Sequence, residues 1–292
     1  MTNPTTTPEP TYDLTMPKGE VGAVVFSSPH SGAAYPDSMK ERTHLPLRVL
    51  RSSEDAFVDA LFASAPDFGA PLLAARLPRA WIDLNRAADE IDPALVAGAP
   101  RGIKSPRINA GLGVIPRVVA ESRTIYSGKI SMREARARIA DAHTPYHRRL
   151  TELLEAARAQ HGQAILFDCH SMPNDALAGS PMVNGARPEI VLGDRFGAAC
   201  DRWLMEAAMD MFAAAGFRVA RNAPFAGGYI TQHYGRPGRG IHAIQIEIDR
   251  SLYMDEAHIA KNNRFSYMER QLRDIIRKLC DLGRDAMPIA AE

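Results

Sequence analysis

The sequence predicts an α/β fold: a single three-layer αβα domain built on a mostly parallel, mixed sheet. Strand-like apolar segments alternate with helical segments along the chain, which is typical of parallel sheets. Several of these strands are wholly apolar, so we expect helices to cover both faces of the sheet. The chain has 292 residues, of which 46% are hydrophobic, and it shows no internal repeat or linker. We therefore expect one domain over residues 20–292, preceded by a flexible, Thr- and Pro-rich tail at 1–19.

Five segments have the apolar or alternating pattern of strands, and they lie at 22–28, 163–168, 189–194, 217–222 and 241–249. In the last of them, the isoleucines at 244, 246 and 248 face one way, and the polar residues at 245, 247 and 249 face the other. Two further apolar segments, 71–77 and 81–86, are separated by Pro78.

Four segments have helical spacing, at 54–65, 131–160, 195–215 and 256–282. The second opens with a capping box at Ser131, and Pro145 is expected to kink or break it near its middle. Gly216 closes the third. Between the helices, residues 89–126 are rich in Pro, Gly and Arg without a sustained period. Such a long irregular segment is typical of the wall or lid of a functional site.

The charges are nearly balanced, with a formal net charge of +1, so electrostatics give no reason to expect nucleic acid or an anionic membrane as partner. The three cysteines, Cys169, Cys200 and Cys280, are far apart, which favours a reducing cytoplasm over a disulfide framework. The first residues lack the pattern of a secretory signal, and no apolar run reaches the ~20 residues of a membrane helix. We expect a soluble, cytoplasmic monomer or small homo-oligomer.

Two predicted strands end in a histidine between small residues: SSPHSG contains His30 and FDCHSM contains His170. Ligands of open α/β sheets bind beyond the carboxyl ends of strands, so these side chains can converge there. Neutral imidazole is a common zinc ligand, and a catalytic zinc needs a third protein ligand, for which Glu54 and Asp55 are both candidates. The alternative is that both histidines are hydrogen-bonded loop residues.

Glu247 places a carboxylate in an otherwise apolar strand. Its burial costs several kcal/mol unless the group is paired or its pKa is raised, and a raised pKa suits a general base. The alternative is a half-exposed strand with one polar face. Asn85 and Arg86 lie side by side after the segment WIDL, and arginine is the natural bidentate partner of a carboxylate. Here the alternative is an ion pair within the chain, with Asp83 or Asp89.

Two other signals carry less weight. His143 and His147 have the i, i+4 spacing of a helical zinc pair, but the segment lacks the Glu of HExxH and has Pro145 between them. We therefore do not expect a metal there. Cys169 is expected in the core, because its side chain points to the face opposite to that of His170.

Taken together, the segments resemble the N-formylglutamate amidohydrolase family. The matching stretches are VVFSSPHSGAAYP, EDAFVDALF, WIDLNRAADEIDP, GLGVIPR, FDCHSMP, IVLGDRFG, NAPFAGGYITQHYG and IHAIQIEIDRSLYMDE, in the family's order from about Val24 to Glu256. That family is similar to the zinc carboxypeptidases and related acylases. The resemblance therefore implies a zinc-carboxypeptidase-like αβα fold, a metal beyond the sheet, and a place in histidine catabolism.

By this resemblance, His30 and His170 are metal ligands, and the metal is a divalent cation, most simply Zn²⁺. The HxxE pair of the carboxypeptidases is absent, since Ala33 stands three residues after His30. The family's pattern has an aspartate at Asp55, so the resemblance favours Asp55 over Glu54 as third ligand. Glu247 matches the position of the general base.

The resemblance also implies a substrate site. Asn85 and Arg86 would hold a substrate carboxylate, and the loop 227–234 would wall the pocket. The side chains expected to bind substrate or the oxyanion beside them are Arg117, Tyr229, Thr231 and His233, with Arg123 as a further candidate for a second carboxylate. The implied reaction is hydrolysis of N-formyl-L-glutamate to formate and L-glutamate. The alternatives are hydrolysis of another N-acyl or N-formyl amino acid or peptide-like amide, and a non-catalytic binding protein on a degenerate hydrolase scaffold.

Overall fold

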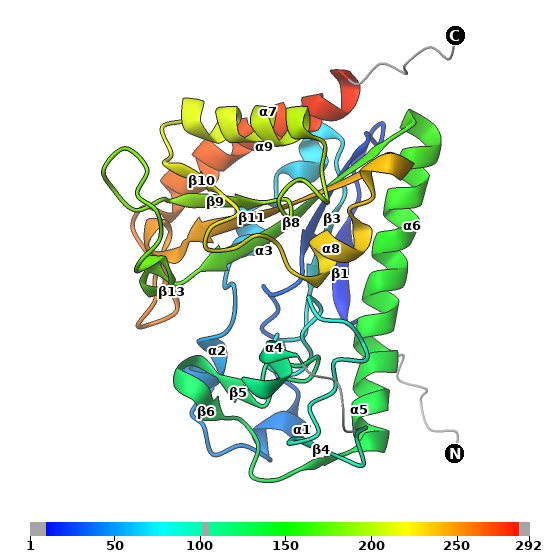
Figure 1. The fold of residues 1–292 in the computed structure, drawn as a ribbon, viewed down its shortest axis with the longest axis vertical. Coiled ribbons are helices and arrows are strands. Elements are labelled where there is room, and N and C mark those ends of the chain that lie inside the picture. The colour runs from blue at the N-terminus through cyan, green and yellow to red at the C-terminus, as the bar shows by residue number, and fades with distance from the viewer. Residues whose placement is uncertain (1–9, 101–104, 286–292) are drawn as a thin grey trace, which may run out of the picture.

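A seven-stranded mixed sheet forms the centre of the protein (Figure 1). The structure is a computed structural model that describes residues 10–100 and 105–285. The strand order is β1-β3-β2-β8-β11-β9-β10. The strands are β1 (Tyr12–Thr15), β2 (Val24–Ser28), β3 (Leu72–Ala75), β8 (Ala164–Met172), β9 (Ile190–Gly193), β10 (Val219–Arg221) and β11 (Ile241–Asp249). Strands β3, β2, β8 and β11 are parallel, whereas β1 and β9 are antiparallel to their neighbours β3 and β11. The predicted mixed, mostly parallel sheet is confirmed.

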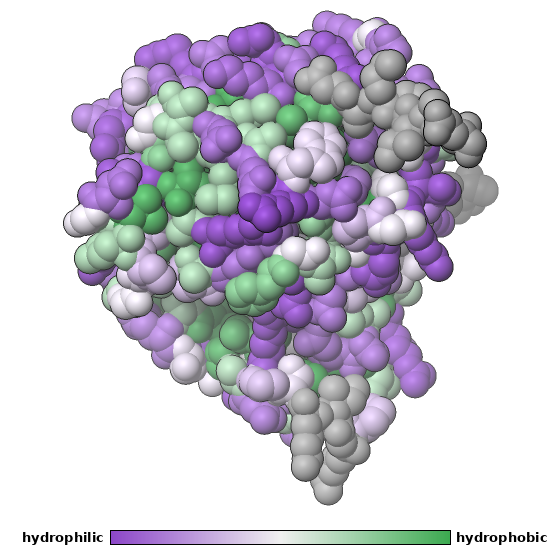
Figure 2. All heavy atoms as spheres, turned by 45° about the horizontal axis from the view of Figure 1, so that its top comes forward, coloured by the Kyte–Doolittle hydropathy of each residue, from purple (hydrophilic) through white to green (hydrophobic). Residues whose placement is uncertain are grey.

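One face of the sheet is mainly apolar and carries the larger core. The isoleucines of β11 at 244, 246 and 248 point to this face, as predicted, together with Phe167 and Cys169 of β8. They pack against α3 (Val58–Leu61), α7 (Arg202–Ala214) and α9 (Phe265–Asp285). Figure 1 shows α7 and α9 lying together over the sheet. With this side brought forward in Figure 2, most of the surface is hydrophilic and the hydrophobic side chains lie in scattered patches.

The opposite face is apolar in one half and polar in the other. Near the start of the strands, Leu166 and Ala243 pack against α6 (Thr144–His161) and α8 (Tyr229–Tyr234). Two and four residues further along β8, the same face carries Asp168 and His170. On β11 it carries Gln245 and Glu247, all of them buried. The polar half therefore lies toward the carboxyl ends of the parallel strands.

Short elements and loops make up the part of the protein below the sheet in Figure 1. They are α1 (Asp37–Lys40), α2 (Leu47–Arg51), β4 (Val96–Ala97), α4 (Pro106–Asn109), β5 (Val118–Val119), β6 (Arg123–Thr124), β7 (Ile130–Ser131) and α5 (Met132–Arg138). Much of the irregular segment predicted at 89–126 lies here; its residues 101–104 fall outside the described ranges. Within the described ranges, 3₁₀ turns occur at η1 (Ala65–Phe68), η2 (Ala120–Ser122), η4 (Asn174–Leu177), η5 (Pro237–Arg239) and η6 (Arg250–Leu252).

The helix predicted at 131–160 is interrupted as expected. The Ser131 hydroxyl accepts a hydrogen bond from the backbone N–H of Glu134, which confirms the predicted cap at its start. A π-helical turn, η3 (Ile139–His143), follows α5, and α6 then begins with Pro145 as its second residue. Proline has no N–H to donate, so the regular ladder of hydrogen bonds changes at this point.

Three predicted helix boundaries were wrong, each for a local backbone reason. The helix expected at 54–65 covers only Val58–Leu61, because Phe57 adopts a left-handed φ of 67°. The helix expected at 195–215 begins at Arg202, because Arg195 and Phe196 have φ of 56° and 58°. The last helix begins at Phe265, and the hairpin of β12 (Met254–Asp255) and β13 (Ala260–Lys261) precedes it.

Of the tail predicted at 1–19, residues 1–9 lie outside the described ranges, and Tyr12–Thr15 forms strand β1 on the edge of the sheet. We still propose that one domain extends over residues 20–292, since the single large sheet joins all the layers. Among the described residues, every helix is too short or too polar to cross a lipid bilayer.

Phe167 offers a test of the larger core. It is fully buried and stacks on Phe26 with ring centroids 5.3 Å apart. Phe167→Ala should lower the free energy of unfolding by about 3–5 kcal/mol, because a buried aromatic ring is replaced by a cavity. Urea unfolding followed by circular dichroism measures this change. Phe196→Ala is the control: its ring is 79% exposed, so the change should stay within about 0.5 kcal/mol. Equal effects of both substitutions would contradict the assigned core.

Candidate metal centre and active site

A cavity of about 740 Å³ lies over the polar half of the sheet. On the sheet side it is lined by His170 of β8 and by Gln245 and Glu247 of β11. On the other side it is lined by residues of the irregular segment, among them Leu112 and Val118. The prediction that this segment walls a site is therefore confirmed in position. Such a position, beyond the carboxyl ends of parallel strands, is the usual ligand site of open α/β sheets.

His30, Asp55 and His170 form a buried group that is able to hold a metal ion. One ligand atom from each residue lies within 4.8 Å of the other two. The Asp55 Oδ2 atom is 2.9 Å from His170 Nδ1 and 3.4 Å from His30 Nδ1. His30 Nδ1 is buried and has no hydrogen-bond partner among the described residues. A buried nitrogen without a partner requires an explanation, and a cation between these three atoms provides one.

Each imidazole of this group has a carboxylate on its other nitrogen. His30 Nε2 lies 2.7 Å from Asp83 Oδ1, and His170 Nε2 lies 2.9 Å from Asp168 Oδ2. Because a carboxylate accepts, both Nε2 atoms carry a proton and donate it. With a metal bound, their Nδ1 atoms would present a lone pair to it, in place of the 2.9 Å contact that His170 Nδ1 makes with Asp55 Oδ2. Metal-binding histidines commonly have this arrangement, which fixes the tautomer and the ring orientation.

The structure places Asp55, and not Glu54, beside the two imidazoles. The backbone N–H of Asp55 donates to the carbonyl of His30, and its Oδ1 atom accepts a 2.9 Å hydrogen bond from Arg250. Glu54 points elsewhere, since its carboxylate accepts hydrogen bonds from Tyr35 and Arg51. Glu54 and Asp55 were predicted to lie in a helix, but they precede it, because α3 begins only after Phe57, which has a left-handed φ.

The electrostatics of the group suit a cation. Burial disfavours charge on His170, but the carboxylates of Asp168 and Asp55 outweigh this effect and hold the His170 pKa well above its usual range. Burial by itself would raise the pKa of Asp55, but the neighbouring imidazoles of His170 and His30 outweigh it and hold that pKa well below its usual range. The carboxylates therefore stay ionised in a buried place, where a divalent cation is strongly attracted.

Glu247 lies beside this group. It faces His170 across the β11–β8 pair, and its side chain lines the cavity. Gln245 donates a 2.8 Å hydrogen bond to its Oε1 atom. Burial raises the Glu247 pKa to about 7, and the charge of His170 opposes part of this shift. A carboxyl group with a pKa near neutrality is able both to accept and to return a proton.

Among the described residues, five arginines line the cavity, and one of them, Arg250, makes hydrogen bonds to three other residues. Arg250 donates to Asp55, to the Ser171 hydroxyl and to the Ser52 carbonyl, so it orients the candidate ligand. Arg79 donates to Asp83 and is 26% exposed.

The other three arginines are Arg86, Arg107 and Arg195. Arg86 donates to the backbone carbonyls of Leu112 and Asn85. Burial lowers its pKa, as do the charges of Arg79 and Arg107, so these three guanidinium groups form one basic cluster. Arg195 comes from a separate segment, the loop after β9, where its side chain donates to the Gly227 carbonyl. An anion bound in this cavity would relieve the repulsion within the cluster.

Comparison with known proteins identifies the family. A model of the N-formylglutamate amidohydrolase family matches residues 22–254. The chain belongs to this family. An N-formylglutamate deformylase of Pseudomonas aeruginosa is 32% identical over 246 residues, which are 83% of this chain and 86% of the relative. One of Pseudomonas putida is 33% identical over 234 residues, which are 80% of this chain and 82% of the relative.

Solved structures agree with the assignment to the N-formylglutamate amidohydrolase family. The N-formylglutamate amidohydrolase of Ralstonia eutropha JMP134 matches with a TM-score of 0.89 and 34% identity, covering 95% of this chain and 99% of that one. A protein of Agrobacterium tumefaciens matches with a TM-score of 0.65 and 19% identity, over 94% of this chain and 97% of that one, and shows the shared fold. The family resemblance predicted from the sequence is confirmed.

The substrate residues predicted for this family member fall into two sets. Asn85 and Arg86 line the cavity, but the Asn85 amide is turned toward the protein. Its Oδ1 atom accepts from the backbone N–H of Ile230, and its Nδ2 atom packs 3.2 Å from His170 Nε2. Asp83 lies 3.9 Å from the Arg86 guanidinium, so the predicted alternative of an internal ion pair is partly realised.

The second set lies away from the cavity. The described lining residues do not include Arg117, Tyr229, Thr231 or His233. Arg117 donates to Asp92, and the ring of Tyr229 stacks on that of His233 with centroids 4.9 Å apart. Arg123 pairs with Glu121 at the surface. The loop at Gly227 and Gly228 does wall the cavity, as predicted.

Sequence reasoning missed several groups of the site: Arg79, Asp83, Asp168, Arg195 and Arg250. One of them had a signal. Asp168 stands two residues before His170 on a strand, and the period of two places both side chains on one face. The arginines had no comparable signal: Arg79 and Arg195 reach the cavity from irregular segments, and Arg250 begins the short 3₁₀ turn η6.

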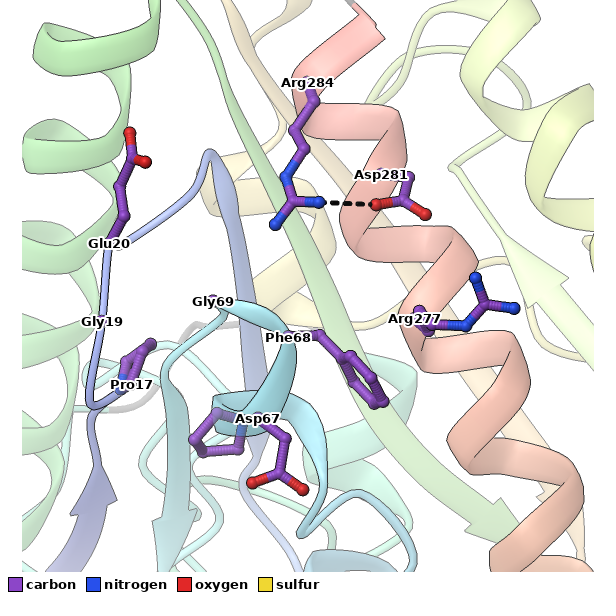
Figure 3. Close-up of a pocket in the computed structure, with 10 residues that line it drawn as sticks. Pro17, Gly19, Glu20, Asp67, Phe68, Gly69, Arg277, Asp281 and Arg284 are labelled. Atoms are coloured by element: carbon purple, nitrogen blue, oxygen red, sulfur yellow. Dashed lines mark hydrogen bonds and ion pairs between the residues drawn. The ribbon is translucent and has the colours of Figure 1, made fainter.

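A second hollow, of about 430 Å³, lies at the opposite edge of the sheet between α9 and the loops around Gly19 and Gly69 (Figure 3). Its charged groups are on the surface, and Arg284 pairs with Asp281 of the same helix at 3.0 Å, as the dashed line in Figure 3 shows. Exposed pairs of this kind contribute little and mark no binding site. The cavity at the carboxyl ends of the strands is therefore the candidate active site.

Proposed function

We propose that this protein is a metal-dependent amidohydrolase that converts N-formyl-L-glutamate and water to formate and L-glutamate. The observation that carries the proposal is the buried His30–Asp55–His170 group next to Glu247 in an arginine-lined cavity. The names of the relatives support the choice of substrate. We further propose that the enzyme acts in histidine catabolism, in the cytoplasm, as a monomer or small homo-oligomer.

Zn²⁺ is the metal that the donor set favours. Two imidazole nitrogens and one carboxylate oxygen form a common catalytic zinc site, which leaves a further position open. A cation held there supplies a nucleophilic water near neutral pH and polarises the carbonyl of a bound amide. Asp83 and Asp168 keep the two imidazoles in the ligating tautomer, and Arg250 keeps Asp55 turned toward them.

Glu247 serves as general base and then as general acid. It takes a proton from the attacking water while the water oxygen bonds to the formyl carbon. When the bond between that carbon and nitrogen breaks, Glu247 returns the proton to the departing amine. Its pKa of about 7, set mainly by burial, allows both steps at neutral pH. Arg79, whose charge acts on Glu247 from the cavity wall, is positioned to stabilise the negative charge that develops on the formyl oxygen.

The remaining arginines match a substrate with two carboxylates. Arg86 and Arg107 belong to the basic cluster on one wall, and we assign the α-carboxylate to them. Arg195 reaches the cavity from the loop after β9, and its backbone N–H donates to the carbonyl of Ala226, which fixes the loop. We assign the side-chain carboxylate to Arg195.

The reaction class is tested by formate release from N-formyl-L-glutamate. The purified protein should release formate, a chelator should abolish the release, and added Zn²⁺ should restore it, because the nucleophile depends on the cation. Formate is measured by a coupled dehydrogenase assay, with N-acetyl-L-glutamate as a parallel substrate. Release that persists at full rate in metal-free protein would contradict metal dependence. Bound zinc without formate release would move the substrate to another N-acyl amino acid.

Glu247→Gln tests the general base. The amide keeps the shape of the side chain but cannot take up the proton, so kcat should fall by about 10²–10⁴-fold. Zinc content and unfolding midpoint should stay at the wild-type values. Glu155→Gln, on the exposed side of α6, is the control and should leave kcat unchanged. Near wild-type turnover of Glu247→Gln would refute the role.

Arg195→Met tests the recognition of the side-chain carboxylate. A lost charge-assisted hydrogen bond is worth about 1.5–3 kcal/mol, so kcat/KM for N-formyl-L-glutamate should fall by roughly 10–100-fold. For N-formyl-L-glutamine, which lacks that charge, the value should change far less. Steady-state kinetics with both substrates measure the difference, and Arg123→Met at the surface is the control. An equal loss of kcat/KM on both substrates would show that Arg195 does not bind the side-chain carboxylate.

A further inference from the structure

His143 and His147 do not form a metal site with each other; instead, both contact backbone carbonyls of the loop 83–86. Both lie on the helix formed by α5, η3 and α6, and their rings stack with centroids 4.1 Å apart. His143 Nε2 lies 2.8 Å from the carbonyl oxygen of Arg86, and His147 Nε2 lies 2.9 Å from that of Leu84. A carbonyl oxygen only accepts, so both Nε2 atoms donate a proton. The two histidines therefore hold the carbonyls on either side of Asn85.

The remaining contacts make this arrangement rigid. His147 Nδ1 lies 2.9 Å from the hydroxyl of Tyr234, which comes from α8. His143 is buried, and burial lowers its pKa; burial and the neighbouring His143 lower the pKa of His147 to about 3. Both imidazoles are thus neutral near pH 7, with their single proton on Nε2. The π-helical turn that ends at His143 directly precedes the pair, and π turns are frequent at functional sites.

The loop held in this way contacts both imidazoles of the candidate metal site. Residues 83–86 belong to neither a helix nor a strand, so no regular hydrogen-bond ladder fixes them. Asp83 accepts the hydrogen bond from His30, and the Asn85 amide packs against His170. Arg86 extends from the same loop into the cavity. A shift of this loop would therefore move three side chains together: Asp83, which contacts His30; Asn85, which contacts His170; and Arg86, which lines the cavity.

We propose that His143 and His147 are positioning residues that aim the metal site by clamping the loop 83–86. The proposal rests on the proposed function, because it assigns the loop to a working metal site. A purely structural role for the same hydrogen bonds is the competing explanation. The chain offers a matched control: His161, on the same helix, also directs its Nε2 atom to a backbone carbonyl, that of Val21, at 2.9 Å. Val21 lies outside the cavity lining.

The experiment compares His143→Leu and His147→Leu with His161→Leu. Zinc affinity is measured by chelator competition without substrate, and kcat and KM are measured with N-formyl-L-glutamate. Removal of groups that orient metal ligands costs about 10–100-fold in metal affinity or activity. His143→Leu and His147→Leu should therefore each lower zinc affinity by about 10-fold or more. His161→Leu should keep wild-type affinity, even if its unfolding midpoint falls equally. Wild-type zinc affinity in the folded His143→Leu and His147→Leu variants would overturn the proposal.

Amide variants keep the test decisive if the leucine variants fail to fold. The nitrogen of His143→Gln reaches the position of Nε2 and restores the donor, whereas that of His143→Asn, one methylene shorter, does not. We expect the Gln variant to retain zinc affinity and the Asn variant to lose it, and equal affinities in the two would overturn the proposal. Formate release by the wild-type protein is scored separately. A wild-type protein that binds zinc but releases no formate would refute the proposed substrate, and the zinc affinities would still decide the role of the histidines.

Discussion

Each candidate metal ligand in this protein contacts a charged group on its far side; for His30 and Asp55 this group comes from another segment, and for His170 it is Asp168 of the same strand. Asp83 and Asp168 accept from the far nitrogens of the two imidazoles, and Arg250 donates to the far oxygen of Asp55. Charges are costly to bury unless they are paired and hydrogen-bonded, and each of these charges is both. The same contacts orient His30 Nδ1, Asp55 Oδ2 and His170 Nδ1 toward one another. The chemistry of the site therefore depends on this outer layer as much as on the ligands.

The sheet makes such an arrangement possible because its strands have two unlike faces. On β8 and β11, one face is mainly apolar, with Ser171 near the end of β8 among the exceptions, and it packs under α3, α7 and α9. The other face changes from apolar to polar along the strand, so Asp168, His170 and Glu247 lie together at its carboxyl end. Strict alternation in a strand keeps the two sets apart. Packing on the apolar face stabilises the fold. The polar face can therefore carry buried ionisable groups that cost folding free energy, such as Glu247 with its pKa of about 7.

The irregular part of the chain completes the site, and the long helix ties it to the sheet. In Figure 1, the helix of α5 and α6 runs beside both the sheet and the short elements below it. Through Arg138, it donates to the carbonyl of Trp81 and to the hydroxyl of Tyr126; through His143 and His147, it donates to the loop that carries Arg86. Segments without regular hydrogen bonding thus gain fixed partners. Arg86, which they present to the cavity, is held by the backbone carbonyls of Leu112 and Asn85.

The sequence alone predicted most strands of the sheet, the two unlike faces of the strand with Glu247, and the place of His30 and His170 where apolar runs break off; it missed β1, and it ended β8 at Asp168 although the strand extends to Met172. These features depend on a period of two and on breaks in apolar runs, which are local properties. The residue pattern left both Glu54 and Asp55 as candidates, and the tertiary structure places Asp55 beside the imidazoles and Glu54 against Tyr35 and Arg51. The tertiary structure likewise decided which arginines reach the cavity; Arg250 donates to Asp55 and Arg195 to the Gly227 carbonyl, both partners from other parts of the chain. Contacts between distant irregular segments have no periodic signature, so no local pattern encodes them.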